Sequence, residues 1–321
     1  MRSPGCGCRV PPHVCAAGRL GETAEQESRF DPGVLNKSHP DYPILARIAK
    51  DVKERLGRRA KAAFAERVLE AVDFVLDPQR TARTEIDDLD RVEKAFIGLK
   101  VEHFVRDLLD APLGIRRDIE LGGMDVDIKN TIRRSRTWMI PSETYSREEP
   151  VLVIASDAKL RTSSMGVLVA RDAYLGAENR DRKRGVLSSA QSNVFWIIED
   201  MPWPASRWDG IDMVRFRDLR TSIRKGADRA AAFFRENPDR PTHRSVLLAL
   251  LHDQNDPMKR LRGNGGARDA LKREGVVLLS RRYGGKFLET IGRPIGKDEF
   301  IALKPDDPDV IARLQADGRL P

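Results

Sequence analysis

The segment Asp118 to Lys129, D-I-E-L-G-G-M-D-V-D-I-K, places two carboxylates and an ammonium where they could hold a metal ion beside a phosphate. Asp127 and Lys129 alternate in an extended run, so both leave the same face of a strand. Asp118 lies on the preceding strand, across a turn marked by Gly122-Gly123. Hard carboxylate oxygens suit Mg²⁺, and a lysine can orient or deprotonate a water molecule. This set could serve the hydrolysis of a phosphodiester.

Alternating Asp and Lys also occur on the solvent face of many hairpins, so the D-x-K triplet alone favours a structural reading. A third carboxylate changes the balance. Glu102 lies in the run Val92 to Leu109, whose apolar residues recur at helical spacing, and it can reach the hairpin as a further acid or a water-mediated ligand. Asp125 is an extra acid on the strand face of Asp127, and its more ordinary role is in a solvated turn.

Basic residues exceed acidic ones, with 57 Lys plus Arg against 49 Asp plus Glu and a net charge of +8. The excess is concentrated in two clusters, residues 180–184 and residues 259–273. Either cluster alone could be a solvated face. Together with the carboxylates they indicate a polyanion such as DNA, which proteins hold through Lys and Arg contacts to phosphates. P-loop, GxGxxG, HExxH and Ser-His-Asp patterns are absent from the sequence, which leaves nucleotide-driven, dehydrogenase and protease readings unsupported.

Residues 1–40 are expected to form a disordered N-terminal extension, because Met1 to Ser28 is rich in Gly, Pro, Ala and Glu without periodicity. All the cysteines lie there, and Cys6-x-Cys8-x4-His13-x-Cys15 is not a familiar zinc spacing. An unstructured tail is the simpler interpretation. Because no apolar signal segment and no membrane-length apolar run occur, we expect a soluble cytoplasmic protein without a membrane association.

Residues 41–197 are expected to form one domain of α/β (α+β) class, with a mixed sheet flanked by helices. Its elements are two amphipathic helices, the helix carrying Glu102, the hairpin and three β-branched strands, in the order 43–56, 58–76, 92–109, 118–129, 151–156, 166–170 and 193–198. Residues 198–208 are dense in Pro and Trp, which predicts a linker. Trp203 and Trp208 are expected to pack there rather than stack on bases.

Residues 209–321 are expected to form a second, mostly helical domain. Four helices and a strand are predicted at 227–235, 242–252 with Thr242 as cap, 256–261 with Asp256 as cap, 267–273 and 276–280. Short helices joined by a Gly-rich turn and followed by a strand suggest a helix-turn-helix with a wing, although packing modules share this pattern. The positions of Arg268, Lys272 and Arg273 on the candidate recognition helix favour DNA contact. Three histidines are expected to be structural: His103, His243 and His252.

From about Val72 to Leu279 the chain resembles the NaeI family of type II restriction endonucleases, within the PD-(D/E)xK nuclease superfamily. The motifs that carry the resemblance are D-F-V-L-D-P-Q-R (73–80), V-E (101–102), the 118–129 hairpin, W-M-I-P (138–141), A-S-D (155–157), L-G-A-E-N-R-D-R-K-R (175–184) and P-M-K-R-L-R-G-N-G-G-A-R (257–268). The last two are long and unusual. One departure is Arg117, which stands where the superfamily often has proline.

The resemblance implies a restriction-endonuclease core and a C-terminal helix-turn-helix or winged-helix domain that binds a second DNA copy. It implies catalytic roles for Glu102, Asp118, Asp127 and Lys129, and Mg²⁺ held by Asp118, Asp127 and the backbone carbonyl of Ile128. DNA contacts are expected from two groups of residues, which are Arg180, Lys183 and Arg184 in the first half of the chain and Lys259, Arg260, Arg262, Asn264, Arg268 and Lys272 in the second.

The expected activity is Mg²⁺-dependent cleavage of both strands of a short, palindromic duplex site, activated by a second DNA copy. A palindrome calls for a homodimer, since two-fold symmetry in the protein matches that of the site. A cognate DNA methyltransferase is an expected companion without a stable complex. The alternatives are a DNA-binding regulator whose nuclease fold no longer cuts, and a repair or nicking endonuclease.

Overall fold

The computed structural model describes residues 35–132 and 135–321. The Cys6, Cys8, His13 and Cys15 cluster lies outside these residues. Residues 35–40, which the sequence assigned to the disordered extension, are placed: Leu35 is 9% exposed, and His39 Nε2 lies 3.2 Å from Asn193 Oδ1. Within the described residues, every helix is too short or too polar to cross a membrane.

The larger sheet has five strands in the order β1-β2-β4-β5-β8. Strand β2 runs parallel to β4, and the other neighbours are antiparallel. The bounds are β1 Ile119–Leu121, β2 Met124–Thr131, β4 Pro150–Asp157, β5 Thr162–Val169 and β8 Phe195–Pro202. This is the mixed sheet that the sequence predicted.

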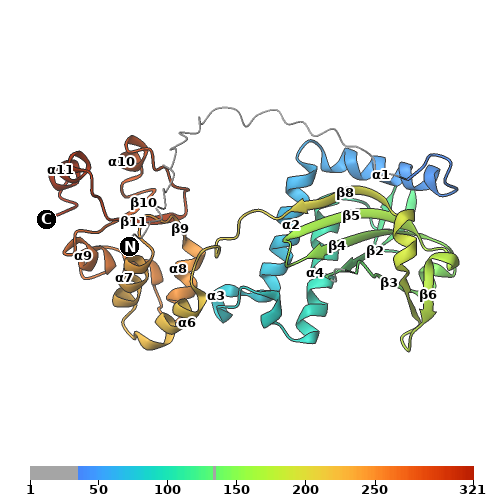
Figure 1. Cartoon of the computed structure of the whole chain (residues 1–321), viewed down its shortest axis with the longest axis horizontal. Helices are drawn as coiled ribbons and strands as arrows, with labels where there is room; N and C mark the ends of the chain where they lie inside the picture. The colour runs from blue at the N-terminus through green and yellow to red at the C-terminus, as the bar shows by residue number, and fades with distance from the viewer. Residues whose placement is uncertain (1–34, 133–134) are drawn as a thin grey trace, which may run out of the picture. The chain divides into compact units, whose positions relative to one another are not determined.

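Three long helices flank this sheet: α1 (Tyr42–Leu56), α2 (Ala60–Leu76) and α4 (Arg91–Leu109) (Figure 1). Helix α4 begins at a capping box in which the Asp90 carboxylate accepts from Glu93 N while Glu93 Oε2 accepts from Asp90 N. Its apolar residues Ile97, Val101 and Val105 recur at helical spacing and are fully buried. The helix therefore has a fixed start and a fixed buried face, which sets the direction in which Glu102 leaves it.

The opposite face of the sheet is covered by a smaller sheet of order β3-β7-β6, which the sequence pattern did not predict. Its strands are β3 Met139–Pro141, β6 Leu175–Glu178 and β7 Lys183–Val186, and β3 leads into the short helix α5 (Ser142–Tyr145). Fully buried Trp138 packs in a shared core with Val151, Val153 and Leu168 of the larger sheet. These three side chains leave β4 and β5 on the face that also carries Asp127 and Lys129, because Asp127 pairs with Val151 and Lys129 with Val153.

Strand β8 continues to Pro202, so the first residues of the predicted linker are strand. The linker tryptophans pack, as expected. Trp203 Nε1 donates to Ser163 Oγ at 2.5 Å, and Trp208, 8% exposed, meets Phe216 edge to face. The turns between these elements are short and include α3 (Pro78–Thr81), η1 (Ile86–Asp88), η2 (Asp172–Tyr174) and η3 (Ser188–Asn193).

Residues beyond Trp208 build a helical unit around a three-stranded antiparallel sheet of order β10-β11-β9. In chain order the elements are α6 (Met213–Ser222), α7 (Gly226–Glu236), β9 (Thr242–His243), α8 (Arg244–Leu250), η4 (Pro257–Leu261), α9 (Ala267–Lys272), β10 (Val277–Ser280), α10 (Gly285–Thr290), β11 (Glu299–Leu303) and α11 (Pro308–Ala316). Asp256 caps η4 as predicted. Thr242 is not the cap of α8, because it lies in β9 and His243 Nδ1 accepts from Ser245 N instead.

Candidate active site

The β1-β2 hairpin brings the predicted carboxylates to one place. Gly122 and Gly123 form its turn with φ of 57° and 71°, a region that favours glycine. The register pairs Ile119 with Val126, which places Asp118, one residue before β1, opposite Asp127. The hairpin therefore brings the backbones of both aspartates opposite each other.

Beyond Val126, strand β2 has no strand partner on its β1 side, because β1 begins only at Ile119. Two carboxylates take over the free backbone N–H groups along this edge. Ile128 N donates to Asp118 Oδ2 at 2.8 Å, and Asn130 N donates to Glu102 Oε1 at 3.2 Å. Because buried backbone donors must be satisfied, these bonds fix Asp118 and Glu102 against the strand. The segment before β1 and helix α4 thus converge on the outer edge of β2.

Each carboxylate oxygen of Asp127 has its own donor. Lys129 Nζ donates to Oδ1 at 2.5 Å, and the hydroxyl of Thr144 in α5 donates to Oδ2 at 3.1 Å. Asp127 is 5% exposed and Thr144 is fully buried. Lys129 Nζ also donates to the carbonyl oxygen of Ile128 at 2.8 Å. Thr144 was not predicted, since a threonine in a polar stretch carries no sequence signal and its role depends on a contact across 17 residues.

The carboxylates repel one another in a site that is largely closed to solvent. Burial raises the pKa of Asp127, the Lys129 ammonium opposes this, and Asp118 adds to it. Burial likewise raises the pKa of Glu102 to about 7; Lys129 and the N–H of Asn130 oppose the rise, while Asp118 and Asp127 add to it. A cation placed among these groups would relieve this repulsion.

A divalent cation such as Mg²⁺ needs several oxygen donors close together. No group of three or more His, Cys, Asp or Glu side chains with metal-binding geometry occurs in the described ranges. The oxygens at the β2 edge nevertheless bind a cation: the Lys129 ammonium lies on Asp127 Oδ1 and the Ile128 carbonyl, with Asp118 beside them. Two carboxylates and a carbonyl are hard donors that suit Mg²⁺, which completes its shell with water and phosphate oxygens. The residues therefore fit the ion.

Arg117, the departure from the superfamily pattern, is buried in a clamp beside Asp118. Its Nε donates to Glu149 Oε2 at 2.5 Å, and its guanidinium also donates to the carbonyl of Glu143. The clamp joins the start of β1 to the loop that contains Thr144. Asp125 accepts from the backbone N–H groups of Ile115 and Arg116, so it organises the loop before Asp118. The sequence favoured a solvated turn residue, whereas Asp125 lies in β2 with its side chain only 12% exposed.

The predicted DNA-contacting residues of the first half lie on the β6-β7 hairpin. Their side chains differ in whether they are exposed or bound to other residues of the protein. Arg180 and Lys183 are exposed at and beside its tip. Arg184 is engaged in the structure: it pairs with Asp172, donates to the carbonyls of Leu175 and Gly176, and lies over the ring of Tyr145 at 5.3 Å. Arg184 therefore holds the hairpin together and is not available to a ligand in this arrangement.

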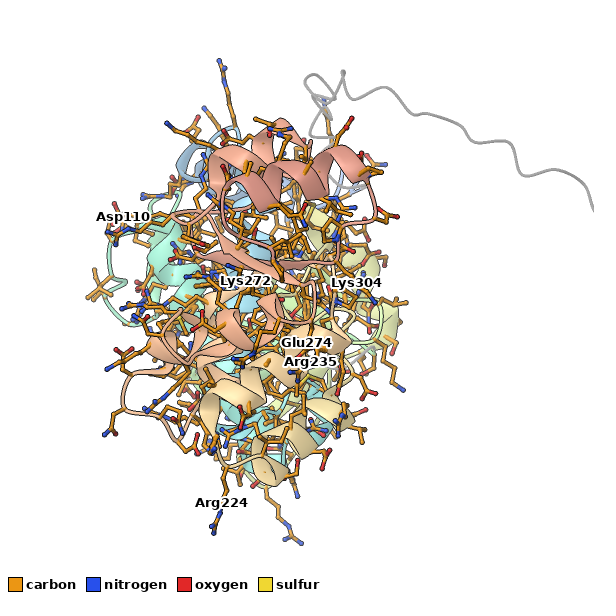
Figure 2. All side chains as sticks on the ribbon, turned by 90° about the vertical axis from the view of Figure 1, so that its left-hand side faces the viewer. Asp110, Arg224, Arg235, Lys272, Glu274 and Lys304 are labelled. Atoms are coloured by element: carbon orange, nitrogen blue, oxygen red, sulfur yellow. The ribbon has the colours of Figure 1, made fainter. Side chains whose placement is uncertain are left out.

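The predicted DNA-contacting residues of the second half also include both exposed side chains and side chains with internal partners. Lys259, Arg260 and Arg262 are exposed on η4 and just after it, and Asn264 forms the following turn with φ of 62°. Arg268 stacks on Tyr283 at 3.8 Å and donates to the carbonyl of Leu278. Lys272, labelled in Figure 2, donates from Nζ to the carbonyl of Gly318 at 2.6 Å. Arg268 and Lys272 thus have structural partners that their sequence positions did not reveal.

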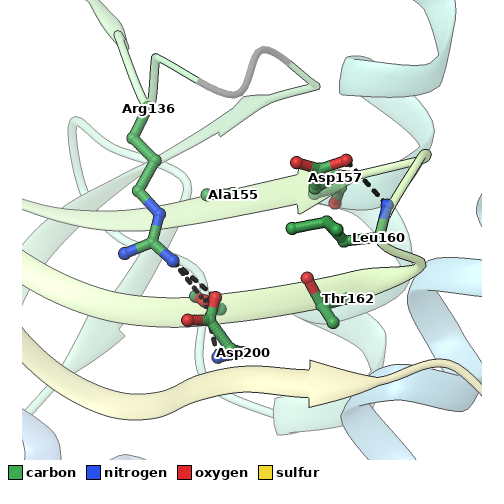
Figure 3. Close-up of a pocket in the computed structure, with 8 residues that line it drawn as sticks. Arg136, Ala155, Asp157, Leu160, Thr162 and Asp200 are labelled. Atoms are coloured by element: carbon green, nitrogen blue, oxygen red, sulfur yellow. Dashed lines mark hydrogen bonds and ion pairs between the residues drawn. The ribbon is translucent and has the colours of Figure 1, made fainter.

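A polar hollow of about 180 Å³ opens at the far end of β4 and β5, on the sheet face of Asp127 (Figure 3). Arg136 and Asp200 point toward each other across it and form an ion pair of 2.5 Å. Asp157 turns back to accept from Leu160 N. Arg136 and Asp200 neutralise each other and Asp157 is bound to backbone N–H groups, so the hollow lacks the grouped carboxylates and ammonium of the β2 edge, which remains the candidate active site.

Replacing Thr144 with Val should weaken binding of Mn²⁺ by roughly tenfold, because Asp127 Oδ2 loses its donor and the carboxylate can rotate. Thr144→Ser keeps the hydroxyl and should retain wild-type affinity. Calorimetric titration of the protein with Mn²⁺ measures both. Equal affinity in the Val and Ser variants would contradict a positioning role for Thr144.

Glu102 should make the metal-free protein less stable as pH rises. Between its ordinary pKa of 4.5 and its raised value of about 7, the unfolded chain has lost this proton while the folded protein keeps it. Stability should therefore fall through this window by up to roughly 3 kcal/mol. Glu102→Gln should lack this part of the decline. Urea midpoints of the wild type and the variant from pH 4 to 8 test the difference, and parallel curves would contradict it.

Comparison with known proteins agrees with this geometry. Residues 49–303 match the family model described as restriction endonuclease NaeI. The type II restriction enzyme NaeI of Lentzea aerocolonigenes is 28% identical over 248 residues, which cover 73% of this chain and 75% of that protein. The family match spans most of the chain and includes the β1-β2 hairpin, α4 and α9. The chain therefore belongs to the NaeI restriction endonuclease family, the type II site-specific deoxyribonucleases.

Proposed function

We propose that this protein is a Mg²⁺-dependent type II restriction endonuclease in which Glu102, Asp118, Asp127 and Lys129 form the catalytic site. The observation that carries the proposal is the convergence of three carboxylates and one ammonium on the outer edge of β2. Asp118, Asp127 and the Ile128 carbonyl would hold the ion. When bound, Mg²⁺ polarises the scissile phosphate and lowers the pKa of bound water.

The chain's own residues have separate tasks in this mechanism. Asp118 is held by Ile128 N and Asp127 by Thr144, so both present fixed oxygens to the site. Lys129 is already close to Asp127 and would turn its ammonium toward the phosphate, where it orients the attacking water and offsets charge in the transition state. Glu102, with its raised pKa, would accept a proton from water near neutral pH.

Cleavage of both strands of a palindromic duplex calls for two such sites, and we propose a homodimer for this reason. A cognate DNA methyltransferase would protect the host site without forming a stable complex. A cytoplasmic location would follow from a DNA substrate inside the cell.

The C-terminal unit is proposed to be a winged-helix domain that binds a second DNA copy and activates cleavage. The element order α7, β9, α8, η4, α9, β10, α10, β11 and the sheet order β10-β11-β9 support this, since a winged arrangement places a helix-turn-helix beside a small antiparallel sheet. Helix α10 lies in the connection between β10 and β11. The exposed cations Lys259, Arg260 and Arg262 support it as well.

Purified protein incubated with plasmid DNA and Mg²⁺ should yield fragments with identical ends. Asp127→Ala and Lys129→Ala should each reduce the cleavage rate at least 1,000-fold, because both groups act mainly on the transition state. Duplex binding in Ca²⁺ or without metal should change little. Mapping of fragment ends and gel-shift titration give both results. Wild-type rate constants in either variant would rule out this site.

Replacing Lys259, Arg260 and Arg262 together with Ala in the full-length enzyme should remove the advantage of a plasmid with several sites over a plasmid with one. Each lost phosphate contact lowers the salt slope of binding by about one unit, so the slope should fall by roughly three. Arg268→Ala serves as a contrast that should lower thermal stability, because Arg268 packs on Tyr283. A triple variant that keeps the multi-site advantage would leave the C-terminal unit without an effector role.

A further inference from the structure

We infer that the β6-β7 hairpin is a ribbon that enters the major groove of the substrate and reads base edges with Arg180 and Arg182. The inference rests on the proposed function, because it assumes a duplex at the β2 edge. It adds the element that distinguishes one sequence from another, which the catalytic residues cannot do, since they contact the backbone of any DNA.

The tip of the ribbon is well ordered by its own turn. Asn179 N donates to the Lys183 carbonyl at 2.9 Å, and Asn179 Oδ1 accepts from the backbone N–H groups of Asp181 and Lys183, both at 2.9 Å. Arg182 adopts φ of 55°, which closes the turn. The tip is thus held by main-chain and Asn179 contacts, and these leave the neighbouring cationic side chains free.

Arg180, Arg182 and Lys183 are exposed. Within the described ranges, their side chains make no hydrogen bond or ion pair, whereas Arg184, which pairs with Glu178 in the ribbon, makes several. The end of this hairpin (Figure 1) thus carries three exposed cations and one exposed acid, Asp181, which lies between Arg180 and Arg182. The excess positive charge attracts a polyanion such as DNA. The ribbon therefore has strands held by internal contacts and an exposed, mainly cationic tip.

The ribbon is joined to the catalytic site through α5, at the end of β6 next to the tip. Thr144 donates to Asp127, and the next residue, Tyr145, donates its hydroxyl to Glu178 at 2.6 Å. The tip begins directly after Glu178, so Thr144 and Tyr145 link the tip to Asp127 through two neighbouring residues of α5. A duplex with its scissile phosphate at Asp127 would present its adjoining groove to this tip.

The dimensions of the ribbon select the groove. The major groove of B-DNA is about 12 Å wide and admits a two-stranded β-ribbon, while the minor groove is about half as wide. Arginine pairs bidentately with the O6 and N7 acceptors of guanine in the major groove. Lys183, at the first residue of β7, is placed to contact phosphate beside the tip. The tip therefore has both the shape and the donors for major-groove reading.

The test compares Arg180→Ala/Arg182→Ala with Arg180→Lys/Arg182→Lys in the full-length enzyme, on a duplex containing the mapped site and on duplexes with one base pair changed. The Ala variant should lower kcat/KM on the mapped site about 100-fold and discriminate little between the duplexes. The Lys variant should keep the salt dependence and still lose discrimination, because lysine lacks the planar fork. Arg58→Ala/Arg59→Ala, a pair of exposed arginines before α2, is the matched control and should behave as wild type.

The groove is tested by replacing purines of the mapped site with 7-deazapurines, which lack the major-groove N7 acceptor. This should slow the wild type at least tenfold and should not slow the Ala variant further. If the Ala variant loses activity equally on all duplexes, or if the 7-deaza loss is the same in the variant and the wild type, the inference is overturned. A wild-type protein that cuts no DNA would instead overturn the proposed function.

Discussion

The candidate site depends on the unpaired outer edge of strand β2. Strand β1 pairs with β2 only as far as Val126, yet β2 continues to Thr131. The N–H groups of Ile128 and Asn130 therefore need other acceptors, and the carboxylates of Asp118 and Glu102 serve. One backbone requirement thus gathers side chains from a hairpin and from a helix. The same edge leaves the Ile128 carbonyl facing them, where it accepts from Lys129.

This arrangement explains why the site is poised for a cation. Three carboxylates lie close together with one ammonium, and burial raises the pKa values of Asp127 and Glu102. Neighbouring contacts hold these groups in place despite their repulsion. Thr144 donates to Asp127, and the Arg117–Glu149 ion pair joins the loop that contains Thr144 to the start of β1.

The sequence predicted the long elements well, because α1, α2, α4 and the strands of the larger sheet have strong periodicity or β-branched runs. It also predicted the grouping of Glu102 with the hairpin residues. Thr144 and the Arg117 clamp were not foreseeable, since each depends on a contact between segments far apart in the chain. The short strands β3, β6 and β7 were missed because three or four residues are too few to show a period.

The charge clusters in the sequence showed where basic residues gather, but not which of their side chains are exposed to a ligand. Arg184 and Lys272 looked equivalent to Arg180 and Lys259, yet the folded protein engages the first two in internal contacts and leaves the other two exposed. Composition counts cations, whereas only packing decides which of them can meet a ligand. Within the β6-β7 ribbon, Arg184 has internal partners, whereas Arg180 and Lys183 are exposed.

The most direct measurement is anomalous diffraction from crystals of the full-length protein grown with Mn²⁺. One peak is expected, bounded by the carboxylates of Asp118 and Asp127 and the carbonyl of Ile128, with the Lys129 ammonium displaced from Asp127. Crystals of Asp118→Asn should show a weaker peak at the same place. A well-occupied ion elsewhere, with Lys129 still bound to Asp127 and Ile128, would contradict the assignment of this strand edge as the metal-dependent catalytic site.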